Sequence, residues 1–187
     1  MRVITGSARG RKLRTLEGDD VRPTTDKVKE AIFSIVHFDI DGSNVLDLFS
    51  GSGQLGIEAL SRGAARCTFV DAARASVQIT NENIKHTGFE AQADVLHTDS
   101  IGYLKTCRQT FDLAFLDPPY RKGILEEALP LLEKHMSHRG IVVCEHETGL
   151  VLPDEVGRMI KSKTYKYGKI EVTVYRIPFG DNVDDDE

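Results

Sequence analysis

The first clear pattern along the chain is that of an amphipathic helix. Apolar residues recur at i, i+3, i+4, i+7 and i+8, the spacing that places side chains on one helical face. These apolar positions are Val28, Ala31, Ile32, Ile35 and Val36. Pro23 disfavours helix in the residue before it, Thr24 or Thr25 can cap the first turn, and Asp26 suits the positive end of a helix dipole. We therefore predict a helix that starts beside these residues and ends near Phe38.

From residue 44 onward, short apolar segments alternate with amphipathic ones, and turns rich in Gly, Ser and Asp separate them. Short apolar runs are typical of strands buried on both faces, and the segments between them are typical of covering helices. The predicted strands are residues 44–48, 67–70, 93–97, 113–116 and 141–144. The predicted helices are residues 56–61, 75–86, 101–106 and 124–134. This alternation indicates an α/β fold with a doubly wound, mostly parallel, Rossmann-like sheet.

Both ends of the chain depart from the alternation. Residues 164–167 and 170–177 are rich in β-formers around Gly168, which predicts a closing antiparallel hairpin. Residues 1–20 are rich in Gly and Arg and predict an extended or hairpin-like arm. We expect one α/β domain over 21–180, preceded by this arm and followed by a disordered acidic tail over 181–187.

The net charge and the distribution of charges along the chain point in different directions about a nucleic-acid partner. The 187 residues carry a net charge of −5 and have a pI near 5.7, which argues against a nucleic-acid partner when taken alone. The charges are unevenly spread, because residues 1–14 hold five bases and no acid, whereas residues 181–187 hold five acids and no base. A second basic stretch over 158–169 is expected to be the solvated face of a loop. The net charge therefore hides two positive patches.

Several classes of protein are not indicated. No apolar run approaches the length of a membrane span, and no secretory signal follows the basic N-terminus, so we expect a cytoplasmic protein. Cys67, Cys107 and Cys144 lack paired spacing and are expected to be reduced thiols. The six histidines are scattered without metal-ligand spacing, so we expect no metal site.

The sequence Asp47-Leu-Phe49-Ser-Gly51-Ser-Gly53-Gln-Leu-Gly56 contains G-x-G-x-x-G between a predicted strand and a predicted helix. Glycines permit positive φ and let a ligand approach the backbone at the helix N-terminus. Asp71, at the end of the next strand, is placed to accept hydrogen bonds from ribose hydroxyls, although it also fits as a helix cap. These features predict a nucleotide-like ligand.

Asp47 bears on which ligand this is. Its carboxylate attracts an ammonium group and repels a pyrophosphate, so it suits the amino-acid end of S-adenosylmethionine better than NAD. Asp99 and Ser100 follow the third strand, where Asp99 can accept from an adenine amino group. On local grounds Asp99 fits equally well as the cap of the helix over 101–106.

A second motif, Asp117-Pro118-Pro119-Tyr120, follows the fourth strand directly and so belongs at the same sheet edge. The prolines stiffen the turn, the Tyr120 ring can stack a base, and Asp117 with the neighbouring carbonyls can accept from an exocyclic NH₂. Two such bonds orient an aromatic amine and return electron density to its nitrogen. This chemistry is what methyl transfer to a base amine requires.

Together the two motifs resemble class I S-adenosylmethionine-dependent methyltransferases that act on nucleobase amines. MRVITGSARGRKL at 1–13, RPTTDKVKEAIF at 22–33, GIEALSRGA at 56–64 and DPPYRKG at 117–123 are similar to the RsmD family, which methylates guanine N2 in small-subunit (16S) ribosomal RNA. The resemblance implies a seven-strand sheet with an antiparallel last strand. It also implies that the glycine motif and Asp71 bind the methyl donor, that Asp99 and Ser100 lie on the adenine side, and that residues 117–120 hold the target amine. It does not extend to the acidic tail.

With an RNA substrate of this kind, the arm becomes a candidate RNA contact, a flexible segment that binds phosphates without reading bases. Its basic residues are Arg9, Arg11, Lys12 and Arg14; Arg22 either lies near cofactor or RNA or only precedes the helix. The alternative is that the arm is merely solvated. The rival functions are a DNA or RNA adenine-N6 or a cytosine amino-methyltransferase, an NAD-dependent oxidoreductase, and a non-catalytic RNA-binding protein with this fold. A monomer requires the fewest assumptions.

Overall fold

The computed structural model describes residues 1–16, 25–119 and 123–178. The α-helices are α1 (Asp26–Ile35), α2 (Gln54–Ser61), α3 (Arg74–Thr87), α4 (Ser100–Thr106) and α5 (Ile124–Glu133), and two 3-10 turns are η1 (His37–Asp39) and η2 (Glu90–Gln92). The strands are β1 (Asn44–Leu48), β2 (Arg66–Asp71), β3 (Ala93–His97), β4 (Phe111–Leu116), β5 (Met136–Glu147), β6 (Glu155–Val156), β7 (Met159–Tyr167) and β8 (Ile170–Arg176).

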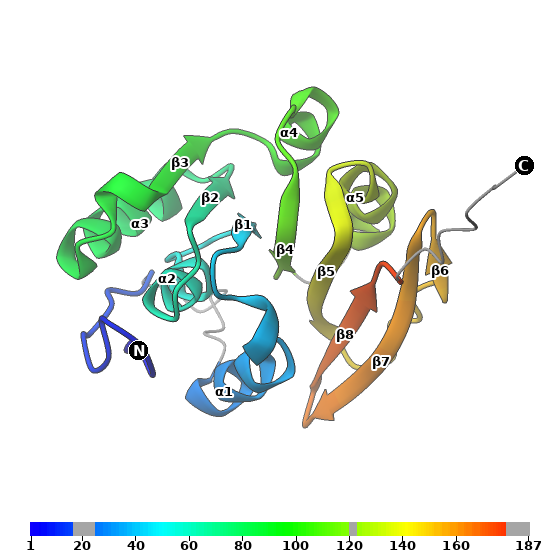
Figure 1. Cartoon of the computed structure of the whole chain (residues 1–187), viewed down its shortest axis with the longest axis horizontal. Helices are drawn as coiled ribbons and strands as arrows, with labels where there is room; N and C mark the ends of the chain where they lie inside the picture. Colours follow the sequence, from blue (N-terminus) through cyan, green and yellow to red (C-terminus); the bar gives the residue numbers. More distant parts are fainter. Residues whose placement is uncertain (17–24, 120–122, 179–187) are drawn as a thin grey trace, which may run out of the picture.

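One sheet runs through the molecule in the order β3-β2-β1-β4-β5-β8-β7-β6. The first five strands are parallel, and β8 pairs antiparallel with both β5 and β7. Helices α1, α2 and α3 cover one face, and α4 and α5 cover the other (Figure 1). This is the doubly wound α/β fold that the alternation predicts.

The strands are apolar because each helical layer buries one of their faces. On the α1–α3 side, Phe33 of α1 packs against Phe115 of β4 with ring centroids 5.4 Å apart. On the other side, Leu129 of α5 is fully buried with Tyr175 of β8. Removing this apolar surface from water is the main stabilising term for both layers.

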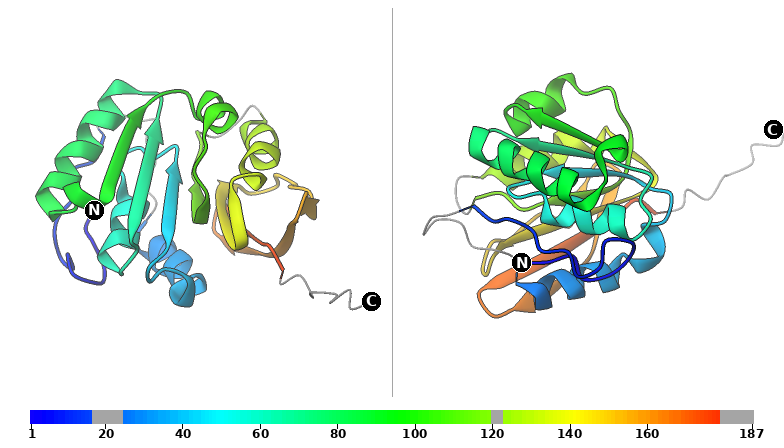
Figure 2. Two further views of the ribbon diagram at one scale, coloured as in Figure 1. Left: turned by 45° about the horizontal axis from the view of Figure 1, so that its top comes forward. Right: turned by 90° about the vertical axis from the view of Figure 1, so that its left-hand side faces the viewer.

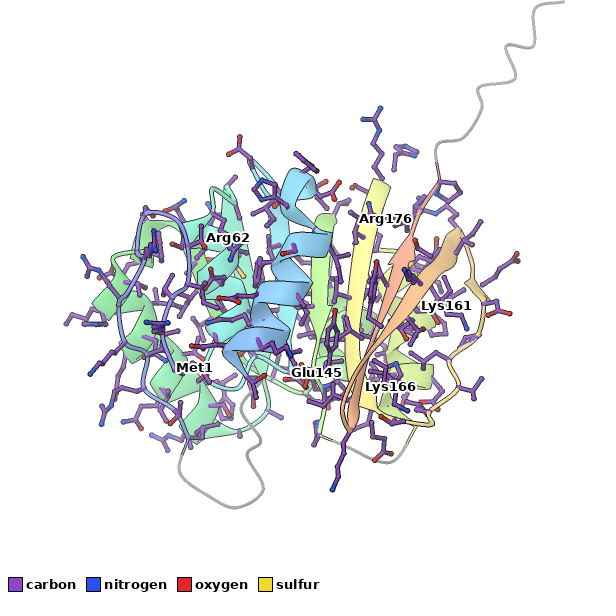
Figure 3. The ribbon with its side chains drawn as sticks, turned by 90° about the horizontal axis from the view of Figure 1, so that it is seen from below. Met1, Arg62, Glu145, Lys161, Lys166 and Arg176 are labelled. Carbon is purple, nitrogen blue, oxygen red and sulfur yellow. The ribbon has the colours of Figure 1, made fainter. Side chains whose placement is uncertain are left out.

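The C-terminal half differs from the prediction in three places. Strand β5 is twelve residues long and begins at Met136, although His138, Arg139 and Gly140 interrupt its apolar run. The basic stretch expected to be a loop face forms β7, along which Lys161 and Lys166 project (Figure 3). Charged side chains are common near sheet edges because they oppose aggregation, so the lysines are compatible with a strand. The described sheet has eight strands instead of the expected seven, because β6 adds a two-residue pair to β7.

The N-terminal arm has the predicted hairpin-like shape, but it is packed against the sheet instead of being the flexible segment expected. Arg2 and Lys12 form an antiparallel bridge, which gives residues 1–13 a hairpin-like shape beside α2 and α3 (Figures 1 and 2). Val3 and Leu13 are buried in the core on this side of the sheet. The Glu58 carboxylate of α2 accepts from Ile4 N at 2.8 Å and from Thr5 N at 2.9 Å. The arm is therefore a packed part of the domain. Its backbone is held in place, and its basic side chains are exposed.

Candidate active site at the carboxyl edge of the sheet

The two chemical motifs leave neighbouring strands at one edge. Strands β1 and β4 are parallel neighbours, and their register pairs Leu48 with Leu116. The next residues along each strand begin the glycine loop and the Asp117-Pro118-Pro119 turn. Because the strand order reverses between β1 and β4, this edge is the topological switch point, where open α/β sheets bind their ligands.

The glycine loop has a conformation that few side chains tolerate. Gly51 and Gly53 have φ of 56° and 77°, and Phe49 has φ of 65°, the one positive value at a non-glycine position in the described residues. A Cβ added to Gly56 would lie 2.3 Å from Phe69 Cε1, so α2 approaches β2 too closely for any side chain there. Left-handed backbone at Phe49 costs about 1–2 kcal/mol, and such strain is concentrated at functional sites.

Asp71 stabilises this loop through both of its oxygens. Its Oδ2 accepts from Gly51 N at 2.8 Å, and its Oδ1 accepts from Ala73 N at 2.8 Å, beside the start of α3. Asp71 therefore supports the turn before α3, but it does not cap the helix as the alternative reading of the sequence suggests, because the N-cap is Ala73 and carries no side-chain cap hydrogen bond. A carboxylate has about four lone-pair positions, so these two bonds leave acceptors for a ligand hydroxyl.

Asp47 lies beneath the loop and is 2% exposed. Its Oδ2 accepts from Gly56 N at 2.9 Å, which joins β1 to the first turn of α2. Burial raises the pKa of Asp47 to about 8, the Gly56 hydrogen bond opposes this rise, and the nearby Asp71 charge adds to it. A carboxyl whose ionised form is this costly gains most from a cationic neighbour.

Two polar atoms of the loop are buried without a partner in the described residues, Ser50 Oγ and Gln54 Oε1. Buried polar atoms usually have hydrogen-bond partners, so such groups next to strained backbone fit a site completed by a ligand. A sulfonium amino acid joined to adenosine matches these donors and acceptors. The loop residues therefore fit S-adenosylmethionine.

Asp99 and Ser100 follow β3 at the same edge. The Asp99 Oδ2 atom accepts from Gly102 N at 2.7 Å and caps α4, which is the alternative that the sequence leaves open. Ser100 is 3% exposed. Across the edge, Pro118 is buried, Asp117 is half-buried and Pro119 is exposed, while Tyr120 lies outside the described residues.

The basic residues of the arm are exposed, and two of them bind α3. Arg11 Nη1 donates to His86 O at 2.5 Å, and Arg14 forms an ion pair with Glu82. Arg9 and Lys12 complete the predicted set on the arm, whereas Arg22 lies outside the described residues.

Two residues that sequence reasoning missed connect these parts. Thr80 Oγ1 donates to Gly51 O at 2.9 Å, and Asn83 Nδ2 donates to Ser52 O at 2.9 Å. Both belong to α3 and are buried. Buried polar residues one helical turn apart, on a helix with few apolar residues, are the signal that could have identified them.

The three cysteines are free, and the described residues contain no cluster of three or more His, Cys, Asp or Glu side chains that could hold a metal ion. The described helices include none that is both long and apolar enough to cross a bilayer.

A glycine loop and an Asp-Pro-Pro turn at the switch point of this sheet define a class I methyltransferase fold, and comparison with known proteins agrees. A solved structure titled "Putative methyltransferase yhhF from Escherichia coli" has 32% sequence identity and a TM-score of 0.83, covering 96% of this chain and 98% of that one.

The family model described as Conserved hypothetical protein 95 matches residues 1–176. "Putative rRNA methyltransferase YlbH" of Bacillus subtilis is 41% identical over 181 residues, which are 94% of this chain and 98% of that protein. "Ribosomal RNA small subunit methyltransferase D" of Escherichia coli is 37% identical over 155 residues, 82% of this chain and 78% of that protein. The chain belongs to this family, the RsmD family.

Proposed function

We propose that this chain transfers the methyl group of S-adenosylmethionine to the exocyclic N2 amine of a guanine in small-subunit (16S) ribosomal RNA. The observation that carries the proposal is the register of Leu48 with Leu116, which places the glycine loop and the Asp117-Pro118-Pro119 turn side by side. A methyl donor held by one loop and an amine held by the other meet at this edge. Family membership supports an S-adenosylmethionine-dependent rRNA methyltransferase.

The cofactor supplies an electrophilic methyl group on a sulfonium centre. Asp47 is proposed to balance the ammonium of the amino-acid end, and Asp71 to accept from ribose hydroxyls. Asp99 and Ser100 are the candidates for the adenine side. These assignments follow from the positions of the residues at one sheet edge and from the acceptor capacity of their side chains.

The Asp117 carboxylate and the carbonyls of Asp117 and Pro118 are the acceptors proposed for the target amine. An aryl amine is a weak nucleophile because its lone pair is delocalised into the ring. Two N–H···O bonds draw density back to nitrogen and fix the angle at which it meets the methyl group. The new C–N bond would form as the C–S bond breaks, leaving S-adenosylhomocysteine as the neutral thioether, and one amine proton would pass to the Asp117 carboxylate or to water.

The target base must leave its stack to reach this edge, since base chemistry inside a helix is blocked. The sequence makes Tyr120 the proposed stacking partner. Replacing Tyr120 with Ala should reduce turnover much more than cofactor affinity.

The exposed arm is proposed to contact the RNA backbone. A protein with this substrate is expected in the cytoplasm. We expect it to act as a monomer and without a metal.

The deciding experiment incubates the protein with isotopically labelled S-adenosylmethionine and small ribosomal subunits, or purified rRNA from cells lacking this protein. Nuclease digestion and nucleoside mass spectrometry then identify the product, with Asp117→Ala as the inactive control. Labelled N2-methylguanosine supports the proposal. Methyladenosine or methylcytosine would instead assign the site to another base amine, and cofactor binding without any methylated product would indicate a non-catalytic RNA-binding protein.

A further inference from the structure

A small recess opens beside the Asp-Pro-Pro turn, on the β5 side. Its volume is about 370 Å³ including the open mouth, and Pro118, Pro119, Ile124 and Leu150 contribute apolar lining. Glu126, Glu145 and Glu147 also line the recess, and Glu145 lies at the lower end of β5 in Figure 3. The recess therefore offers apolar surface for the faces of a planar ring and carboxylates for its edge.

The sheet register places this carboxylate next to the Asp-Pro-Pro turn. Leu116 of β4 pairs with Cys144 of β5, so Asp117 and Glu145 are the next residues on two parallel neighbours. Adjacent strands lie about 4.8 Å apart, and paired residues of parallel strands point to the same face. The register thus places Asp117 and Glu145 at adjacent positions of the edge where the target amine is proposed to bind.

Glu145 is 4% exposed, whereas Glu147, two residues further along the same strand, is exposed. Glu145 takes part in an interaction within the chain. A carboxylate has about four lone-pair positions, so Glu145 can have a partner within the chain and still accept a donor from a ligand. A buried acid that lines an open recess is a candidate for a role in binding.

Guanine presents a matching pair of donors. Its N1–H and its N2 amine are adjacent on the Watson–Crick edge, whereas adenine has an acceptor at N1 and no amine at C2. We propose that Glu145 accepts the N1–H of the target guanine, while the Asp117 side chain and a carbonyl of the turn accept from N2. This inference rests on the proposed function and adds the residue that distinguishes guanine from other purines.

The hydrogen bond from N1–H would be charge-assisted, and such hydrogen bonds are stronger than neutral ones. It also places N2 at a fixed distance from the methyl donor, because two adjacent atoms of the base edge are held by two adjacent strands. Losing the charge should lower kcat/KM for the guanine substrate about ten- to a hundredfold.

The test compares Glu145→Gln with wild type on RNA that carries either guanosine or 2-aminopurine at the methylated position. 2-Aminopurine keeps the amine at C2 but has an acceptor in place of N1–H. Wild type should prefer guanine strongly. Glu145→Gln should lose activity on guanine. Its preference for guanine over 2-aminopurine should become smaller or reverse, because the glutamine amide donates to N1 of 2-aminopurine. Affinity for S-adenosylmethionine should stay at the wild-type level.

The matched control is Glu171→Gln, which removes the same charge from the neighbouring strand β8 and should leave the preference unchanged. If Glu145→Gln loses cofactor binding, Glu145→Asp decides the point: it keeps the charge, withdraws it by one methylene, and should slow methylation of guanine without any gain on 2-aminopurine. A wild-type preference retained by Glu145→Gln would overturn the role of Glu145. Absence of N2-methylguanosine with wild type would instead overturn the proposed function itself.

Discussion

The Asn83 side chain binds both backbone groups of Arg14. Its Oδ1 accepts from Arg14 N at 2.8 Å, and its Nδ2 donates to Arg14 O at 2.9 Å. The remaining Nδ2 hydrogen donates to Ser52 O at 2.9 Å, within the glycine loop. Asn83 is 1% exposed, so one buried amide connects the basic arm to the proposed cofactor loop. Binding of RNA and binding of cofactor should therefore depend on the same residue.

Replacing Asn83 with Asp tests this connection at constant size. The carboxylate keeps the acceptor for Arg14 N but loses the donors to two carbonyl groups, which leaves buried acceptors unpaired at a cost of about 1–3 kcal/mol each. We expect affinities for S-adenosylmethionine and for rRNA to fall together, each about tenfold or more. Calorimetry and filter binding measure the two.

Asn81→Asp is the control for Asn83→Asp. Asn81 lies on the same helix, is exposed, and donates to Val77 O of its own helix at 2.9 Å. It should leave both affinities near wild type. A fall in RNA affinity alone in Asn83→Asp would show that the arm and the glycine loop act independently.

The arm itself has a predictable salt signature. Arg11 and Arg14 also bind α3, so replacing them would remove contacts within the chain as well as charge, and Arg9 and Lys12 are therefore the better pair to test. Neutralising Arg9 and Lys12 to Ala should weaken rRNA binding and reduce the slope of log affinity against log salt by about 0.7–0.9 for each phosphate that the variant no longer neutralises. Lys105→Ala on α4 serves as the comparison, and an identical slope in Arg9→Ala/Lys12→Ala would remove the arm from the RNA interface.

Asp47 links cofactor binding to protons. Burial raises the pKa of Asp47 to about 8, so the carboxyl is protonated at pH 6 in the protein without ligand. An ammonium group beside it favours the ionised form, and binding of S-adenosylmethionine should then release close to one proton. Calorimetric titrations at pH 6 in two buffers with different ionisation enthalpies measure this release. Asp47→Asn should show none, and equal heats in both buffers for wild type would separate Asp47 from the ammonium site.

The same pKa affects stability. In the unfolded chain Asp47 ionises near pH 4, so between about pH 4 and pH 8 the folded state holds a proton that the unfolded state has lost. The stability that this proton represents is fully present below pH 4 and is lost as the pH rises to about 8. Urea unfolding across this range should show a smaller decline for Asp47→Asn than for wild type.

Local patterns predict those parts of the fold whose neighbours are near in sequence. The strands over 44–48 and 93–97 have the predicted bounds, because a short run of strand-forming residues between turns is enough to define a strand. Only the first is buried as expected, since the second lies at the sheet edge and is half-buried. Most of strand β7 is not predicted from the local sequence. Its lysines are typical of an exposed loop, and the residues form a strand because they pair with β8 in the assembled sheet.

The residues of the site likewise fall into those that the local sequence predicts and those that it does not. Glycine and proline act on the backbone locally, so the G-x-G-x-x-G loop and the Asp-Pro-Pro turn are recognisable as motifs. Asn83 and Glu145 gain their roles from partners or from a register that no local window contains. Ile4 N, for example, reaches a carboxylate 54 residues away. The fold and the motifs are thus readable from the sequence, whereas the polar contacts that join them require the structure.

One such contact is the buried pair of Lys29 and Glu58. Both residues are fully buried, and Lys29 Nζ lies 3.5 Å from Glu58 Oε2 and donates to Arg2 O at 2.6 Å. Glu58 also accepts from the two arm amides and from Arg62 Nε at 2.9 Å. Desolvation lowers the pKa of Lys29, and the Glu58 charge opposes this. The ion pair therefore lies between α1, α2 and the arm and joins all three.

Breaking this pair should release the arm and destabilise the domain. Lys29→Met leaves a buried carboxylate with less charge balance, and Glu58→Gln leaves a buried ammonium and turns an amide NH₂ toward backbone donors, so each should cost about 3–5 kcal/mol of unfolding free energy. The double variant should lose less than the sum, because neither charge then remains alone. Urea unfolding of the four proteins measures the coupling. Strictly additive losses would mean that the two charges act separately, and that the arm is held by its backbone hydrogen bonds to Glu58 without help from Lys29.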